Sequence, residues 1–255
     1  MIILLSPAKT FDFTTNVPSK LKSKPLFERD AKKLVDIVLP LGTNGIARLM
    51  SISENLATLN FERLQNFRGT KKIKQAVFAF NGDVYEGLNV KTFSEKDLIF
   101  SQKHLRILSG LYGFLRPMDN IKPYRLEMGT RLLTERGENL YDWWGGRVAK
   151  ELEKDLLGHS DKYIINLASI EYFKVVKRFL TCRVITPIFE EKKKDKFKTI
   201  GIYAKKARGL MASFILKNRI NSTEDLKNQF VLLLIMLFVM VYLVIERFKM
   251  EILLI

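Results

Sequence analysis

The chain has 255 residues, of which 47% are hydrophobic, and its formal net charge is +16. One cysteine, Cys182, excludes a disulfide framework and a cysteine-based metal site, and the two histidines, His104 and His159, lack ligand spacing. We therefore expect no metal and no cofactor. The charge favours a polyanionic partner, such as nucleic acid, a nucleotide or a membrane surface. The amino-terminal sequence MIILLSPAKT has no basic region before its apolar run, which indicates a strand and a cytoplasmic protein rather than a signal peptide.

Apolar runs that favour strands alternate with stretches of helical spacing. Strands are expected at residues 2–5, 76–80, 105–108, 163–167, 183–189 and 197–203. Helices are expected at residues 26–39, 84–88, 94–104, 140–157, 171–179 and 204–218. Residues 44–67 have the pattern of two helices joined at 51–53, where Ser51 and Glu54 have capping-box spacing. Because no repeat or linker is visible, the pattern predicts a single α/β domain over residues 1–228, with helices wrapped around a mixed central sheet.

Residues 104–129 combine a short buried strand, a glycine turn and a loop that is rich in arginine. Pro117 and Pro123 prevent a continuous helix across the second half. Arg116 and Arg125 lie in this loop, and guanidinium groups suit planar recognition of phosphate or carboxylate. The alternative is a structural turn with scattered surface arginines.

Three cations, Lys205, Lys206 and Arg208, are expected in the first turn of the helix at 204–218. The amino terminus of a helix prefers acidic residues, so each exposed cation there costs roughly 0.3–1 kcal/mol. Free N–H groups and these cations together predict a bound anion at the start of the helix.

Charged or hydroxyl side chains follow most of the expected strands. In open α/β sheets, ligands bind at the carboxyl edge of the strands. We therefore expect a basic cleft at the strand ends, formed by Ser6, Lys9, Asp83, Arg116, Arg125, Glu127, Ser169, Glu171, Lys205, Lys206 and Arg208. The predicted nucleic-acid-binding residues are Lys9, Arg116, Arg125, Lys205, Lys206 and Arg208.

Acidic groups inside a basic cleft keep an enzymatic function open. Ser6 and Lys9 would serve as nucleophile and base, and Asp83, Glu127 and Glu171 would supply acid–base groups or hold a magnesium ion. The substrate would be phosphorylated or nucleotide-like. Alternatively, each acid forms a salt bridge, and the pair Arg125–Glu127 is an example.

The segment 229–255 differs in composition from the rest of the chain. Residues 230–245 read FVLLLIMLFVMVYLVI and contain no charge. These 16 residues are fewer than the roughly 18–20 that span a bilayer, so we expect no stable membrane association. A buried helix, a marginal anchor and an out-of-frame translated end are the candidates, and the abrupt change of composition favours the last.

Six stretches, taken together, resemble the YaaA family, also called DUF328 or UPF0246. They are SPAKT at 6–10, FNGDVYEGL at 80–88, HLRILSGLYGFLRP at 104–117, PYRLEMG at 123–129, INLASIEYF at 165–173 and YAKKARGLM at 203–211. The resemblance implies a cytoplasmic α/β protein with a positively charged cleft that binds DNA. It also implies protection against hydrogen peroxide by limiting free intracellular iron, and a helix-hairpin-helix element, for which residues 46–67 are the candidate.

The sequence shows no element that would read bases. DNA binding is therefore expected to depend mainly on phosphate contacts and to have weak sequence specificity. No obligate protein partner is evident.

Overall fold

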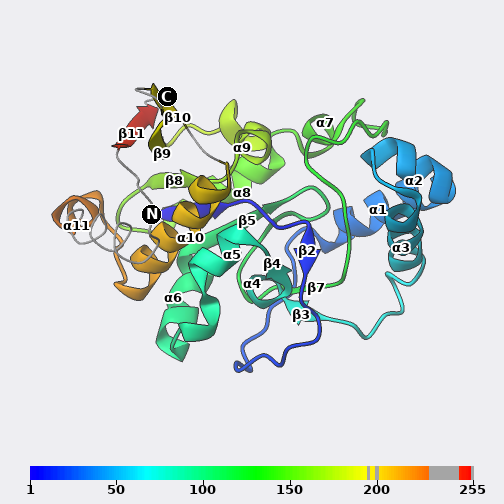
Figure 1. The fold of residues 1–255 in the computed structure, drawn as a ribbon, viewed down its shortest axis with the longest axis horizontal. Helices are drawn as coiled ribbons and strands as arrows, with labels where there is room; N and C mark the ends of the chain where they lie inside the picture. Colours follow the sequence, from blue (N-terminus) through cyan, green and yellow to red (C-terminus); the bar gives the residue numbers. More distant parts are fainter. Residues whose placement is uncertain (194–195, 199–200, 230–246, 254–255) are drawn as a thin grey trace.

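The computed structural model describes residues 1–193, 196–198, 201–229 and 247–253, and its centre is a mixed, seven-stranded sheet (Figure 1). The strands lie in the order β10 (Lys196–Lys198), β9 (Arg183–Lys193), β8 (Tyr163–Leu167), β1 (Ile2–Leu5), β5 (Leu105–Ser109) and β6 (Gly113–Leu115), and β11 (Arg247–Leu253) pairs with β9. Strands β9, β8, β1 and β5 are parallel, whereas β6, β10 and β11 are antiparallel to their partners. The prediction of a mixed α/β sheet is confirmed.

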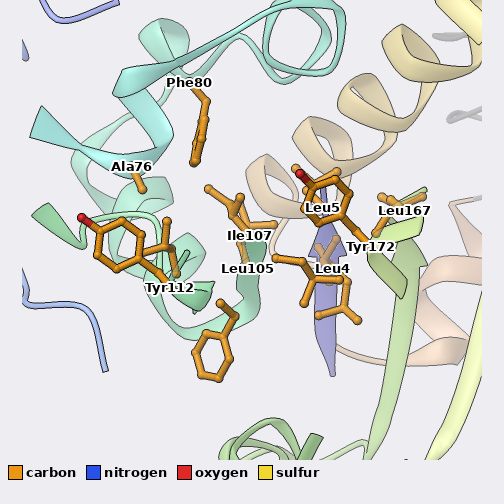
Figure 2. Close-up of a cluster of buried hydrophobic side chains, with 14 of the residues drawn as sticks. Leu4, Leu5, Ala76, Phe80, Leu105, Ile107, Tyr112, Leu167 and Tyr172 are labelled. Atoms are coloured by element: carbon orange, nitrogen blue, oxygen red, sulfur yellow. The ribbon is translucent and has the colours of Figure 1, made fainter. Parts of the chain in front are cut away.

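Strand β1 occupies the middle of the sheet because all four of its side chains are apolar and fully buried. A strand that is covered on both faces reads as a continuous hydrophobic run, as this one does. Leu4 and Leu5 lie beside Leu105 and Ile107 of β5 and Leu167 of β8 in the core (Figure 2).

Helices flank the sheet, and two small two-stranded ladders lie beside it. The helices are α1 (Glu28–Val38), α2 (Gly42–Met50), α3 (Glu54–Gln65), α4 (Ala76–Ala79), α5 (Asp83–Leu88), α6 (Glu95–His104), α7 (Leu140–Trp144), α8 (Arg147–Leu157), α9 (Ile170–Lys177), α10 (Gly201–Lys217) and α11 (Thr223–Asn228). The ladders pair β2 (Thr10–Phe11) with β4 (Phe80–Asn81), and β3 (Lys74–Gln75) with β7 (Asn120–Ile121). Figure 1 shows α1, α2 and α3 grouped at one end of the molecule.

The expected strand at 76–80 is wrong, because residues Ala76–Ala79 form one helical turn before β4. All four side chains of this turn are buried, and a short apolar run does not distinguish a buried strand from a buried turn. The expected helix at 140–157 is broken by Gly145, whose φ of 48° is left-handed.

The two helices expected within 44–67 are confirmed as α2 and α3, but the capping box is wrong. Ser51 ends α2 with a left-handed φ of 50°, and Ser53 is the N-cap of α3. Ser94, in contrast, is the N-cap of α6 and forms a capping box with Asp97.

The expected strand at 197–203 is also wrong, because β10 ends at Lys198 and α10 begins at Gly201. Lys205, Lys206 and Arg208 therefore lie after the first turn of α10. The predicted anion site required these three cations in the first turn of the helix, so the argument for that site does not hold.

Close packing of α10 on α5 depends on two glycines. A Cβ atom at Gly209 would overlap the carbonyl oxygen of Val84, and one at Gly87 would overlap that of Lys206. Only glycine lets the two backbones approach this closely. The contact places α10 beside the loop that begins α5.

The apolar run at 230–245 lies outside the described residues. Within the described ranges, no helix is long and apolar enough to cross a membrane.

We predict that Gly209→Ala lowers the free energy of unfolding by roughly 1–3 kcal/mol, since the added methyl group has no space. Gly201→Ala, in the same helix but with no atom within 4 Å of the added Cβ, is the matched control and should be neutral or slightly stabilising. Urea unfolding of both variants measures the difference. Equal stability of the two variants would contradict the close α5–α10 contact.

Candidate functional site

Two serine hydroxyls meet where β1 and β8 end. The backbone N–H of Ser169 donates to Oγ of Ser6 at 2.8 Å, and Oγ of Ser6 donates to Oγ of Ser169 at 3.3 Å. Ser169 is also the N-cap of α9 and accepts from the N–H of Tyr172. The hydroxyl of Tyr85 donates to the carbonyl oxygen of Ser6 at 3.0 Å. These bonds tie β1, β8, α5 and α9 together at the carboxyl edge of the sheet, where such folds bind ligands.

Glu127 holds two cations at this edge. Its Oε1 lies 3.4 Å from Nζ of Lys9 and 3.1 Å from Nη2 of Arg125. The side chains of Arg125 and Glu127 are 17% and 18% exposed, whereas that of Lys9 is 69% exposed. The expected salt bridge between Arg125 and Glu127 is therefore present. The partner of Lys9 is a carboxylate, so the geometry gives no support for a pair of Ser6 and Lys9 as nucleophile and base.

Arg63 on α3 adds a third cation beside Arg125. Burial lowers the pKa of the Arg63 guanidinium, and repulsion by Arg125 lowers the pKa further. Nη1 of Arg63 donates to Oδ1 of Asn60 at 3.4 Å. Lys9 and Arg125 thus share the carboxylate of Glu127, and Arg63 lies beside Arg125.

Glu171 connects the arginine loop to α9. Its Oε1 accepts from the N–H of Gly129 at 3.0 Å, and its carbonyl oxygen accepts from the hydroxyl of Tyr141 at 3.0 Å. Tyr172, the next residue, is buried, and burial raises the pKa of its hydroxyl. Glu171 therefore orders the loop at Gly129 and joins it to α9.

Asp83 and Lys205 extend the edge towards α5 and α10. Nζ of Lys205 lies 3.9 Å from Oδ2 of Asp83, and the side chain of Lys205 is 58% exposed. The backbone at Gly82 packs against Ala8, the neighbour of Lys9. Burial lowers the pKa of the Arg208 guanidinium, which has no acidic partner among the described residues.

The groups around Glu127 leave almost no enclosed space. Lys9, Arg125, Glu127, Tyr124 and Tyr172 are among the residues that line a pocket of about 20 Å³. That volume holds little more than one water molecule. The carboxyl edge in this structure therefore presents a charged surface rather than a small-molecule pocket.

Comparison with known proteins assigns the family. A family model described as peroxide stress protein YaaA matches residues 1–231. The chain belongs to the YaaA family. A UPF0246 protein of Burkholderia lata is 49% identical over 234 residues, which cover 89% of this chain and 90% of the relative. UPF0246 proteins of Burkholderia ambifaria and Saccharophagus degradans are 48% and 45% identical, with 89% of this chain covered in each case and 90% and 91% of the relatives.

Arg116, from one of the stretches that carry the YaaA resemblance, does not join the others. Strand β6 runs antiparallel to β5, so its carboxyl end returns to the amino edge of the parallel strands. There Nη2 of Arg116 pairs with Oδ1 of Asp119 at 3.0 Å and donates to the carbonyl oxygen of Lys24. The expectation that Arg116 shares a cleft with Lys9 and Arg125 is wrong. The glycines at 110 and 113 are the sequence signal for the reversal.

Several residues of the carboxyl edge had not been predicted. Tyr85, Tyr172 and Tyr141 bond to the backbone around the strand ends, and Arg63 arrives from a separate helix pair. A buried tyrosine occupies a core position of the hydrophobic pattern, so the pattern does not show that its hydroxyl forms a hydrogen bond at the site. Nothing in the sequence near residue 63 indicates that α3 approaches residue 125.

The amino edge contains both histidines. Nδ1 of His104 lies 2.9 Å from the carbonyl oxygen of Met1, and the ring centroids of His104 and His159 are 4.6 Å apart. Burial lowers the pKa of each imidazole to about 4, and repulsion by the amino terminus and Arg106 lowers both pKa values further. Both rings are therefore neutral at pH 7.

We predict acid destabilisation between pH 6.5 and 4. A histidine whose pKa is about 6.5 unfolded and about 4 folded binds its proton more tightly in the unfolded chain, so stability is full above pH 6.5 and falls as the pH drops. The pair should cost roughly 2–4 kcal/mol by pH 4. The double variant His104→Gln, His159→Gln should have a flatter profile in urea melts across this range. An unchanged profile would contradict the assignment.

Proposed function

We propose that this YaaA-family peroxide stress protein binds duplex DNA through phosphate contacts at the carboxyl edge of its sheet. The observation that carries the proposal is that Lys9 and Arg125 share the carboxylate of Glu127 while a third cation, Arg63, lies beside Arg125. One carboxylate leaves this group with a net positive charge. The phosphates of DNA are a fitting partner, since cations that replace condensed counterions gain affinity without reading sequence.

Exposure of the cations supports contact with an extended polyanion. Lys9 and Lys205 are 69% and 58% exposed, so both can reach a phosphate without a change in the fold. Their present partners, Glu127 and Asp83, are 3.4 and 3.9 Å away. These distances are long and both ammonium groups are largely exposed, so each pair contributes little to stability. Little free energy is therefore lost when the lysine leaves its carboxylate partner and contacts a phosphate.

The α2–α3 hairpin is the candidate second contact with DNA. The three residues between the helices are compact, and α2 carries Arg48 in its last turn. Arg63 on α3 links the hairpin to the cation group at the carboxyl edge. In this proposal the hairpin and the edge contact neighbouring phosphates.

Protection against peroxide by limiting free iron stays a prediction from the family resemblance. Among the described residues, no three His, Cys, Asp or Glu side chains are grouped to hold a metal ion. The proposal concerns DNA binding, and the effect on iron levels is a separate measurement.

We predict that the double variant Lys9→Gln, Lys205→Gln weakens binding to duplex DNA and flattens its salt dependence. The slope of log K against log salt should fall by about 0.9 for each lost phosphate contact. Lys162→Gln, Lys177→Gln is the matched control, since it removes the same charge from exposed positions directly before β8 and at the end of α9, away from the carboxyl edge. Fluorescence anisotropy over a series of salt concentrations measures both slopes. Equal losses of DNA affinity in both variants would refute a localised site and show that binding depends only on the net charge of the protein.

We further predict that Ser6→Ala and Glu171→Gln retain DNA affinity and peroxide protection to within about twofold, since neither removes a positive charge. Glutamine at 171 still accepts from the N–H of Gly129, so the loop stays ordered. Survival of cells in hydrogen peroxide and anisotropy binding are measured in parallel. Loss of protection with intact binding and an unchanged melting temperature would instead establish the enzymatic alternative.

A further inference from the structure

A large cavity lies at the amino edge of the sheet, away from the proposed DNA surface. Its volume is about 610 Å³, which is within the usual range for small-molecule sites. It is bounded by the end of α6, the start of β5, the end of β6 and the end of α8. Its polar lining comprises Gln102, Lys103, His104, Arg106, Arg116, Asp155, His159, Ser160 and Asn221.

Two arginines lie next to each other across this edge. Ile107 pairs with Leu115, so Arg106 and Arg116 occupy the next opposed positions of the two antiparallel chains. Like charges in such positions repel each other. Each guanidinium has its own acid, since Arg106 pairs with Asp155 at 2.7 Å and Arg116 pairs with Asp119 at 3.0 Å. Of these acids only Asp155 lines the cavity, so three cations face one carboxylate there.

Several donors around the cavity are uncommitted within the described part of the chain. Nη1 of Arg116 makes no hydrogen bond there, although Nε and Nη2 do. Lys103 is exposed, and its ammonium group has no acidic partner among those residues. Ser160 and Asn221 offer a hydroxyl and an amide at the rim. Arg106, in contrast, is 4% exposed and is held in place by Asp155 and the carbonyl oxygens of Gln102 and Leu105.

We propose that this amino-edge cavity binds a small oxyanion, namely a molecule with a phosphate or carboxylate group. Nη1 of Arg116 and Nζ of Lys103 bind the anionic group, and Arg106 contributes a fixed positive charge from the wall of the cavity. The volume of about 610 Å³ suits a small molecule, so we take the ligand to be one. The site does not depend on the proposed DNA function, because it shares no residue with the carboxyl edge.

The two histidines give a direct readout of this site. His104 and His159 are the only histidines of the chain, and both line the cavity. An anion bound beside them stabilises the imidazolium form and raises the pKa of both rings. In untagged protein, the side-chain NMR spectrum therefore contains two imidazole signals, and both report on the same cavity.

The experiment titrates inorganic phosphate into the untagged protein and follows the two imidazole signals, with sodium chloride at matched ionic strength as the reference. We expect saturable shifts of both signals in phosphate and small, non-saturating shifts in chloride. Duplex DNA should leave both signals in place while it binds to the protein. Equal shifts in chloride, or no saturation in phosphate, would overturn the proposal.

Two variants locate the site. Lys103→Gln removes an exposed charge, and Arg116→Lys keeps the charge that Asp119 needs but removes the planar fork of donors. Each should raise the apparent Kd for phosphate about tenfold, since one charge-assisted contact is lost. Lys9→Gln at the carboxyl edge is the control and should leave the phosphate titration unchanged. Unchanged affinity in both variants with intact folds, or an equal loss in the control, would refute the site.

Discussion

Burial of β1 between β5 and β8 fixes the positions of both charged edges of the sheet. Its four side chains are withdrawn completely from water, and its backbone is hydrogen-bonded to a parallel neighbour on each side. A strand in that position cannot shift by one residue without moving its whole apolar set out of register. Ser6 is therefore held beside Ser169 at one end, and Met1 beside His104 at the other.

The distribution of charge is more informative than its sum. At the carboxyl edge, the single carboxylate of Glu127 contacts both Lys9 and Arg125, and Arg63 lies close by. At the amino edge lie two neighbouring arginines that would repel each other. Each of them pairs with a different aspartate. Each edge retains more positive than negative charge, and this excess supports a surface contact at one edge and an enclosed anion at the other.

Antiparallel pairing of β6 with β5 separates these two sites. A hairpin reverses the chain after Ser109, so the arginine loop begins at the amino edge with Arg116 and reaches the carboxyl edge only at Arg125. Arg116 and Arg125 are nine residues apart in sequence but lie at opposite edges of the sheet. Glu171 then fastens the loop to α9 through the N–H of Gly129.

The sequence by itself determined the strands β1, β5 and β8, the helices α1 and α6, and the family. The strands and helices depend on local patterns, such as a continuous apolar run or apolar residues at helical spacing. It also indicated the residues that follow β1 and β8, because the carboxyl edge of a parallel sheet is a general binding position.

Only the tertiary structure decided which of these residues meet. All four side chains of the helical turn Ala76–Ala79 are buried, and the close packing of α10 on α5 depends on Gly87 and Gly209. The approach of Arg63 to Arg125 and the return of Arg116 to the amino edge depend on contacts between segments far apart in sequence or on strand direction. Local residue patterns do not predict such contacts, because the contacts are stabilised by the packing of the whole core.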